Sequence, residues 1–127
     1  MLRMGVDVVD IARLERLMLR WPRLQSRLFT KQEIDYALSR AHPPENLAAR
    51  LAAKEATFKA LGTGWPGISW HDVEVVTKGH REPPQLKLTG RAAQLGGGCQ
   101  AIVSLAHDGG IALAHVLLLP ATGPADA

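Results

Sequence analysis

The stretch "RLAAKEATFKALGTG", residues 50–64, decides the fold, because it predicts an alanine-rich helix that ends at a glycine and whose small side chains leave room for something to approach closely. Glu55 precedes Lys59 by four residues, the order in which an acid–base pair stabilises a helix. Arg50 and Lys54 have the same spacing but like charges, which costs roughly a few tenths of a kcal/mol. This pattern raises the question of which ligand or partner compensates for the repulsion.

Before this helix, the sequence predicts one strand and two shorter helices. Residues 3–9 alternate along "RMGVDVV" and predict a strand. Asp10 is a suitable N-cap for the first helix, which ends before Pro22. Thr30 and Glu33 have the spacing of a capping box and begin the second helix. The long helix is therefore the third, and it runs from about position 45 to 61.

After the long helix the hydrophobic period changes to that of strands. Residues 72–78 and 85–90 alternate, and residues 99–107 and 110–119 predict two strands joined at "DGG", a strong hairpin signal. A short helix capped by Thr89 fits between the second and third of these strands. The order is strand, three helices and about four further strands. We therefore predict an α+β fold with helices on one face of a mainly antiparallel sheet.

Composition is that of one small globular domain. The chain has 127 residues, of which 46% are hydrophobic and 21% charged. We expect a single domain over residues 1–119 and a disordered tail over residues 120–127. The single cysteine, Cys99, excludes an internal disulfide and favours the cytoplasm. Asp7 argues against a signal peptide, and the apolar stretch 111–120 falls short of the roughly 20 residues that a membrane span needs.

Positive charge is concentrated at the beginning of the chain. The net charge is +3, and residues 1–31 alone contain seven basic and three acidic side chains. Arg13, Arg16 and Arg20 form a stripe along the first helix, either as a solvated face or as a docking surface for an acidic partner. A nucleic-acid-binding module is the alternative, but only 5% of the residues are aromatic and no aromatic–basic pattern suggests base stacking.

Two acidic side chains are candidates for chemistry. Asp7 lies within an apolar strand, where it is either an exposed acid at the strand end or a buried one that needs a partner. Glu55 is either in a surface ion pair with Lys59 or part of a site for a divalent cation and phosphate. In the second interpretation, oxygen ligands hold Mg²⁺, and Arg50 and Lys54 supply positive charge beside the carboxylate.

The loops add weaker candidates. His107 and Asp108 lie at the mouth of the predicted hairpin, as turn residues or as general bases. Thr63 and Gly64 follow the end of the long helix, where we consider a contact with a ligand. A phosphate loop is not predicted there, because anions favour helix N-termini.

Four stretches carry a resemblance to a known family. In chain order they are "GVDVVDIARL" (5–14), "RLFTKQEIDYAL" (27–38), "RLAAKEATFKALGTG" (50–64) and "VSLAHDGGIALAHV" (103–116). In order and distance they resemble the holo-[acyl-carrier-protein] synthases, the short class of 4′-phosphopantetheinyl transferases. The resemblance implies an α+β fold and transfer of 4′-phosphopantetheine from coenzyme A to a serine of apo acyl carrier protein. It also implies release of adenosine 3′,5′-bisphosphate, in fatty acid or polyketide synthesis.

The resemblance also implies roles and an assembly. Asp7 and Glu55 match the family's metal-binding acids, Lys59 matches its following lysine, and Arg13 matches an arginine that docks the carrier protein. The implied assembly is a homotrimer with active sites between subunits. Coenzyme A contacts are expected from a wider set of residues: Arg50, Lys54, Lys59, Thr63, Gly64 and His107.

Two questions stay open at this level. The base that takes the serine proton is Glu55 through a bound water, His107 or Asp108. A relative that binds coenzyme A without transferring anything is the second alternative function.

Overall fold

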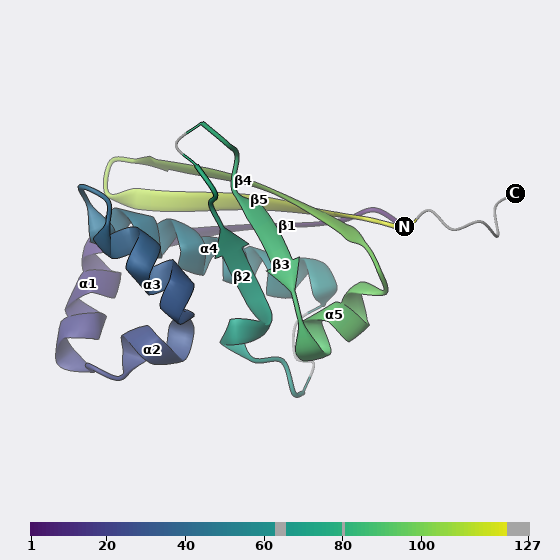
Figure 1. Ribbon diagram of the computed structural model, residues 1–127, viewed down its shortest axis with the longest axis horizontal. Helices are drawn as coiled ribbons and strands as arrows, with labels where there is room; N and C mark the ends of the chain where they lie inside the picture. Colours follow the sequence, from purple (N-terminus) through teal and green to yellow (C-terminus); the bar gives the residue numbers. More distant parts are fainter. Residues whose placement is uncertain (63–65, 80, 122–127) are drawn as a thin grey trace, which may run out of the picture.

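The long helix α4 (Pro43–Leu61) lies across one face of a three-stranded antiparallel sheet in a computed structural model (Figure 1). The structure describes residues 1–62, 66–79 and 81–121. The central strand β5 (Ile111–Leu119) pairs with β1 (Arg3–Asp10) on one side and β4 (Gln100–Asp108) on the other. The two outer strands are therefore opposite edges of this sheet.

Three helices gather at one end of α4, as Figure 1 shows. They are α1 (Ile11–Arg20), α2 (Leu24–Leu28) and α3 (Lys31–Leu38). The helix α2 is an addition to the sequence-based prediction, because its five residues are too few for a clear hydrophobic period. No helix among the described residues combines the length and apolar character that crossing a membrane requires.

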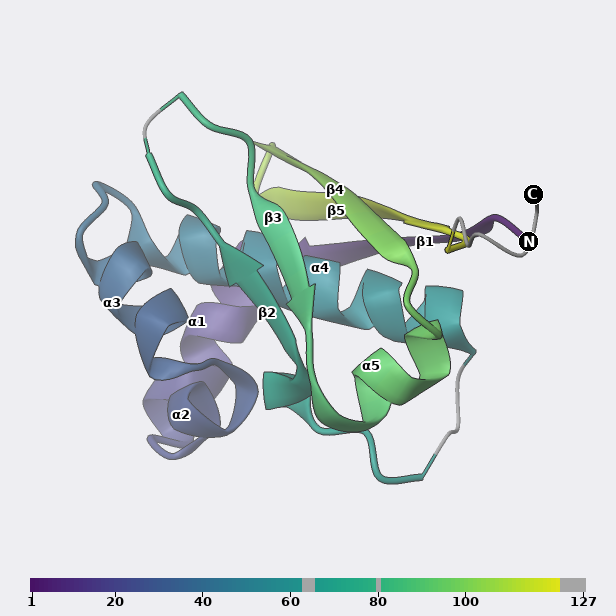
Figure 2. The same ribbon diagram turned by 45° about the vertical axis from the view of Figure 1, so that its right-hand side comes forward.

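The remaining elements form a second, smaller layer beside α4 (Figure 2). A 3-10 turn η1 (Trp70–Asp72) leads into β2 (Val73–Val76), which pairs with β3 (Gln85–Leu88), and α5 (Gly90–Gly96) follows. The five predicted strands are thus present, but they divide into two sheets. The reason is that β2 buries its valines against the core that α4 shares with the main sheet, so the β2–β3 ribbon extends this core.

Several local predictions are confirmed. Thr30 and Glu33 form a full capping box at α3. Gly109 and Gly110 join β4 to β5 with positive φ values of 57° and 81°, which a tight hairpin turn requires. The short helix α5 is present with Thr89 at its N-cap position, as predicted, although the Thr89 side chain makes no capping hydrogen bond.

The contact between β1 and α4 depends on a glycine. A Cβ atom at Gly5 would lie 1.9 Å from the carbonyl oxygen of Ala56, so no other residue fits without moving the strand. Ala56 itself is fully buried. Because side chains alternate along a strand, Asp7 and Val9 face α4 together with Gly5.

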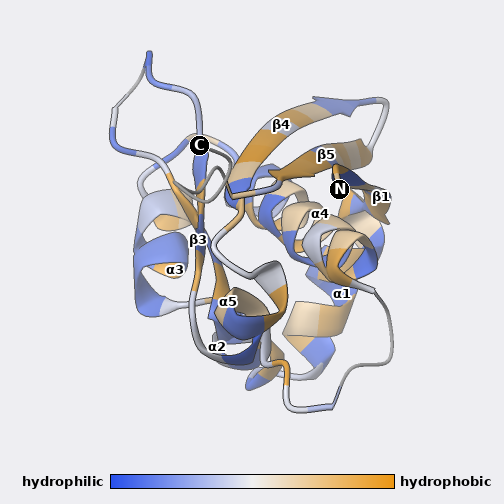
Figure 3. Ribbon diagram, turned by 90° about the vertical axis from the view of Figure 1, so that its right-hand side faces the viewer, coloured by the Kyte–Doolittle hydropathy of each residue, from blue (hydrophilic) through white to orange (hydrophobic). Residues whose placement is uncertain are grey.

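The opposite face of the main sheet is apolar and exposed; we call it the outer sheet face. Figure 3 shows the hydrophobic colour along β4 and β5. His115 lies at its centre, paired with Val6 on one side and Ser104 on the other. The exposed apolar side chains of this face are Met4, Val6, Val8, Ile102, Ile111 and Leu113. The alternation predicted for β1 is correct, and its most apolar side chains, Met4, Val6 and Val8, point away from the core.

Replacing Gly5 by alanine should destabilise the protein by about 3 kcal/mol or more, because the new methyl group collides with buried backbone. Urea denaturation measures the free energy of unfolding. Gly79→Ala is the matched control, since a Cβ there meets nothing closer than 3.9 Å and the residue has no positive φ. Equal stability of the two variants would contradict the close approach of β1 to α4.

Candidate functional site

Asp7, Glu55 and Lys59 meet where β1 crosses α4. The ammonium of Lys59 is 2.8 Å from Oδ1 of Asp7 and donates to the carbonyl oxygen of Val6 at 3.3 Å. The Asp7 and Glu55 carboxyl groups lie within hydrogen-bonding reach of each other. The structure thus brings together the two acids that are 48 positions apart in the sequence, together with the lysine.

The two carboxyl groups have pKa values shifted in opposite directions. Burial, together with the hydrogen bond and negative charge of Asp7, raises the pKa of Glu55 to about 7, although Lys59 acts to lower it. Burial also acts to raise the pKa of Asp7, but hydrogen bonds with Glu55 and Lys59 outweigh it and hold that pKa below its usual range. At neutral pH the pair therefore shares between one and two negative charges.

The Asp7–Glu55 pair fits a divalent cation. Oδ2 of Asp7 is buried and has no hydrogen-bond partner among the described residues. Two oxygen ligands from protein suit Mg²⁺, which keeps several waters or phosphate oxygens as its other ligands. Among the described residues we find no group of three or more Asp, Glu, His or Cys side chains that could hold a metal ion. The arrangement leaves positions open for a phosphate-bearing substrate.

Arg50 faces a different part of the molecule. It is only 2% exposed, and its guanidinium lies 4.5 Å above the ring of Tyr36. It donates to Oδ1 of Asn46 at 2.6 Å and to Oγ1 of Thr77 at 2.9 Å, while its Nε has no acceptor in the described part of the chain. Burial lowers its pKa, with nearby acidic groups acting in the opposite direction. Within the part of the chain that the structure describes, no carboxylate forms an ion pair with it.

A cavity of about 700 Å³ adjoins Arg50; we call it the β4 cavity. It lies between the first half of α4, the loop before β3 and strand β4. His107 lines it, with Nδ1 at 3.8 Å from the Glu45 carboxylate. Asp108 is exposed beside the hairpin turn. His107 and Asp108 thus belong to the β4 edge, whereas Asp7 belongs to the β1 edge of the same sheet.

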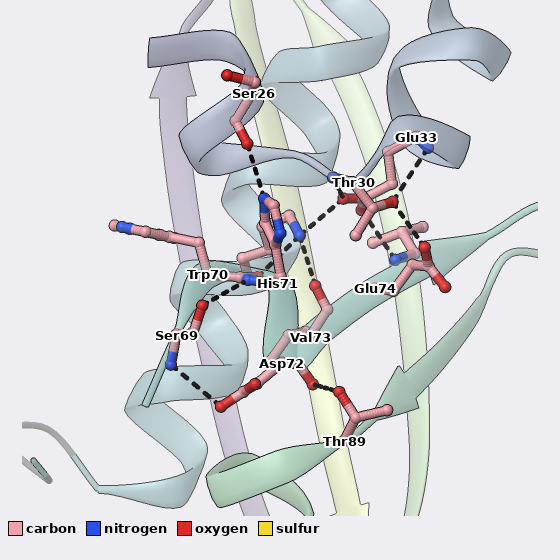
Figure 4. A network of polar contacts seen from close by, with 12 residues as sticks. Ser26, Thr30, Glu33, Ser69, Trp70, His71, Asp72, Val73, Glu74 and Thr89 are labelled. Atoms are coloured by element: carbon pink, nitrogen blue, oxygen red, sulfur yellow. Dashed lines mark hydrogen bonds and ion pairs between the residues drawn. The ribbon is translucent and has the colours of Figure 1, made fainter. Parts of the chain in front are cut away.

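Lys54 is placed elsewhere, in a buried ion pair. Its ammonium is fully buried at 2.8 Å from Oε1 of Glu33, and it donates to the carbonyl oxygens of Trp70 and Val73. Figure 4 shows the network of polar contacts to which Glu33, Trp70 and Val73 belong. Burial lowers its pKa, while Glu33 acts to raise it. The expectation that Lys54 supplies charge beside Glu55 is therefore corrected: it joins α4 to α3 and β2.

Arg50 also does not lie beside Glu55 within one chain, because the two side chains leave α4 on different sides. The sequence offered a signal for its true surroundings, since Asn46 and Arg50 have the i, i+4 spacing at which an amide can accept from a guanidinium. No local signal pointed to Thr77 or Glu33 as partners, because they come from other elements.

The three predicted docking arginines are exposed on α1. Arg13 also lines a second cavity, together with Glu55, so this stripe begins beside the acidic pair. Arg20 lies 5.4 Å from the ring of Trp21, which is itself 57% exposed. The positions of Thr63 and Gly64 lie outside the described residues.

Comparisons with known proteins agree in family and fold. The model of the "4′-phosphopantetheinyl transferase superfamily" matches residues 3–101. The holo-[acyl-carrier-protein] synthase of Moorella thermoacetica is 45% identical over 93% of this chain and 94% of its own length. That of Geobacter metallireducens is 46% identical over 90% and 94%.

Solved structures are also similar. A complex of ACPS with CoA, from an organism given as Chronobacterium ammoniagenes, matches with a TM-score of 0.82 and 30% identity, over 96% of this chain and 99% of that one. The Helicobacter pylori holo-[acyl-carrier-protein] synthase in complex with coenzyme A matches with a TM-score of 0.77 and 27% identity, over 91% and 98%.

In the metal-free protein, Glu55→Gln should be stabilising at about pH 8. The folded chain holds the Glu55 proton up to a pKa of about 7, whereas the ordinary value is 4.5. The free energy of unfolding therefore falls as the pH rises between these values. Because Glu55 is only half-buried, we expect a gain on the order of 1 kcal/mol near pH 8 and none near pH 4.

Urea denaturation in the presence of a chelator measures this effect, with the exposed Asp35→Asn as control. Added Mg²⁺ should stabilise the unaltered protein near pH 8 but not the Glu55→Gln variant. If Glu55→Gln were less stable than the unaltered protein near pH 8, the interpretation that the ionised acidic pair lowers the free energy of unfolding would be wrong.

Proposed function

The chain belongs to the holo-[acyl-carrier-protein] synthases of the 4′-phosphopantetheinyl transferase superfamily, and from this membership we propose that it transfers 4′-phosphopantetheine from coenzyme A to a serine of apo acyl carrier protein. The observation that carries the proposal is the cluster of Asp7, Glu55 and Lys59. Two acids that share a site with a lysine suit a substrate with a negatively charged diphosphate.

In the proposed reaction the serine Oγ attacks the phosphorus that bears pantetheine. The new bond is between that oxygen and phosphorus, and the bond to the bridging diphosphate oxygen breaks. The leaving group is adenosine 3′,5′-bisphosphate, and the serine proton passes to a base. Asp7 and Glu55 would hold Mg²⁺, which when bound neutralises charge on the diphosphate.

Lys59 and Glu55 have distinct tasks in this proposal. The ammonium of Lys59 is half-exposed next to Asp7, so it can donate to a phosphate oxygen as charge develops on the leaving group. Glu55, acting through a bound water, is our choice of base, because it lies beside Asp7, where the diphosphate is proposed to bind. His107 and Asp108 lie at the other sheet edge and could reach the same serine only from a second copy.

The surroundings of Arg50 suggest where the nucleotide half of coenzyme A binds. A buried guanidinium without a carboxylate partner is costly unless an anion joins it. The β4 cavity supplies room for such an anion, and His107 lines the same wall. We propose that this cavity binds the phosphate-bearing adenosine of the donor.

The outer sheet face supports a homotrimer. The acidic pair and the β4 cavity lie at opposite edges of one sheet, so one chain does not bring them together. In a ring of three copies the β1 edge of each chain meets the β4 edge of the next, and the exposed apolar face is covered. The proposed active site is then formed between subunits.

The carrier protein is proposed to dock on the α1 arginines. Arg13, Arg16 and Arg20 are exposed on one helix that begins beside Glu55, and carrier proteins of this kind are expected to be acidic. A role in fatty acid synthesis and a cytoplasmic location complete the proposal. The single cysteine supports that location.

The decisive test is mass spectrometry of apo carrier protein incubated with coenzyme A, Mg²⁺ and this protein. The carrier should gain one phosphopantetheine group, and Glu55→Gln should slow the reaction by roughly 10²-fold or more. Asp35→Asn, an exposed acid on α3, is the matched control and should keep full activity. Binding of coenzyme A without any mass gain would favour the non-transferring alternative instead.

Mixing two inactive variants tests the site between subunits. Asp7→Asn damages only the β1 edge, and Arg50→Gln damages only the β4 cavity. After subunit exchange in an equal mixture, about a quarter of the sites in randomly mixed trimers combine two intact halves. Activity should return to about that fraction of the unaltered protein. If each chain holds a complete site, mixing restores nothing.

A further inference from the structure

A histidine lies at the centre of the outer sheet face. His115 is exposed on the central strand β5, directly opposite Val6 of β1 and Ser104 of β4. Because side chains alternate along a strand, its neighbours on the same face of β5 are Leu113 and Leu117. An imidazole therefore stands in the middle of a surface whose other side chains are mainly aliphatic.

The two candidate parts of the active site lie on the other face of the sheet. Asp7 is paired with Ala114, which is buried in the core, so the Asp7 carboxylate and the imidazole of His115 leave the sheet in opposite directions. His107 is paired with the buried Ala112 and lines the β4 cavity. His115 is therefore separate from the groups that we assign to the reaction.

No carboxylate in the described part of the chain forms an ion pair with His115. The two acids on the outer sheet face, Asp10 and Asp108, are both paired with Ile111. They lie at the hairpin end of the sheet, four residues from His115 and thus roughly 13 Å away along the strand. In addition, Oδ1 of Asp10 already accepts from the backbone N–H of Arg13 at 2.9 Å.

Basic groups are also distant from the centre of this face. The amino group of Met1 precedes β1, at the opposite end of the sheet from the hairpin turn. Arg3 is paired with the fully buried Leu118 and therefore points to the inner side, where its guanidinium donates to the carbonyl oxygens of Leu95 and Gly96. Among the described residues, His115 is thus the one titratable side chain at the centre of the outer sheet face.

Assembly would remove His115 from water. In the proposed ring the outer sheet face of each copy is covered by its neighbours, and the imidazole is covered with it. A neutral imidazole can be accommodated, because the hydroxyl of Ser104 opposite it is able to donate or to accept a hydrogen bond. An imidazolium would be a buried charge without a counterion, repeated in all three copies.

We propose that His115 makes the assembly of this chain depend on pH, because each copy must release the imidazole proton to solvent before the ring closes. The inference rests on the proposed function, since it takes a second copy as the partner that covers this face. That partner is favoured because Asp7 and the β4 cavity lie at the two edges of the same sheet and need a second copy to meet.

The direction of the effect follows from proton linkage. Histidine is the side chain that ordinarily changes its charge between about pH 5 and 8. Assembly releases protons in this range, so acid favours the separate chains and neutral pH favours the ring. Because the site is proposed to form between subunits, mild acid would also remove the complete site.

Analytical ultracentrifugation of the full chain at about pH 7.5 and about pH 5.5, over a range of protein concentrations, tests this inference. Each histidine that must be neutral in the ring should lower the association constant about tenfold between these conditions, and three copies about a thousandfold. His115→Gln and His115→Leu cannot take up a proton and should assemble equally well at both pH values. Circular dichroism at both pH values shows whether each variant is folded.

Two control variants separate His115 from other groups that titrate in this range. His71→Gln removes an exposed histidine on η1, which contacts the carbonyl oxygen of Ser26 and lies outside the main sheet. Glu55→Gln removes the carboxyl group whose pKa is about 7. Both variants should keep the pH dependence of the unaltered protein.

Three results would overturn the inference. Equal association constants of the unaltered protein at both pH values would do so and leave the proposed ring standing. A pH dependence that persists in both His115 variants, or that disappears in Glu55→Gln, would assign the effect to another group. An unaltered protein that stays monomeric at about pH 7.5 would overturn the inference and the proposed ring together, and the carrier-protein assay would still decide the proposed transfer separately.

Discussion

The approach of β1 to α4 at Gly5 and Ala56 is the constraint on which the candidate site depends. Only a residue without a side chain allows the strand backbone to rest on the helix backbone. The same alternation that turns Gly5 toward the helix turns Asp7 toward it two residues later. Asp7 then meets Glu55 and Lys59, so the packing of one glycine determines where the charges converge.

The helix α4 presents polar side chains in three different environments: Glu55 and Lys59 beside β1, Lys54 in a buried ion pair, and Arg50 beside the β4 cavity. Arg50 and Lys54 can therefore lie four residues apart although both are positively charged. Lys54 is neutralised by Glu33, with backbone oxygens as further acceptors. Arg50 has Asn46, Thr77 and the Tyr36 ring, but no carboxylate partner among the described residues. The burial of each positive charge is therefore compensated differently. The charge of Lys54 is neutralised within the fold, whereas the buried charge of Arg50 remains available to a ligand.

The main sheet is the reason for which we propose an assembly of copies. Its inner face packs on α4, and its outer face leaves valine, isoleucine, leucine and methionine side chains in water. The acidic pair and the β4 cavity occupy its two edges. A ring of copies would bury the apolar face and complete the site through the same contacts, which links stability to activity.

The sequence by itself determined the local structure and the family. Caps at Asp10 and Thr30 and the paired glycines after Asp108 act through neighbouring backbone, so their signals are short-range and readable. The resemblance identified Asp7, Glu55 and Lys59. Tertiary structure alone decided which face of β1 meets the helix, which of Arg50 and Lys54 is neutralised, and how the strands divide between two sheets. Those outcomes depend on contacts between distant segments, such as Glu33 with Lys54, whose energies a linear pattern does not contain.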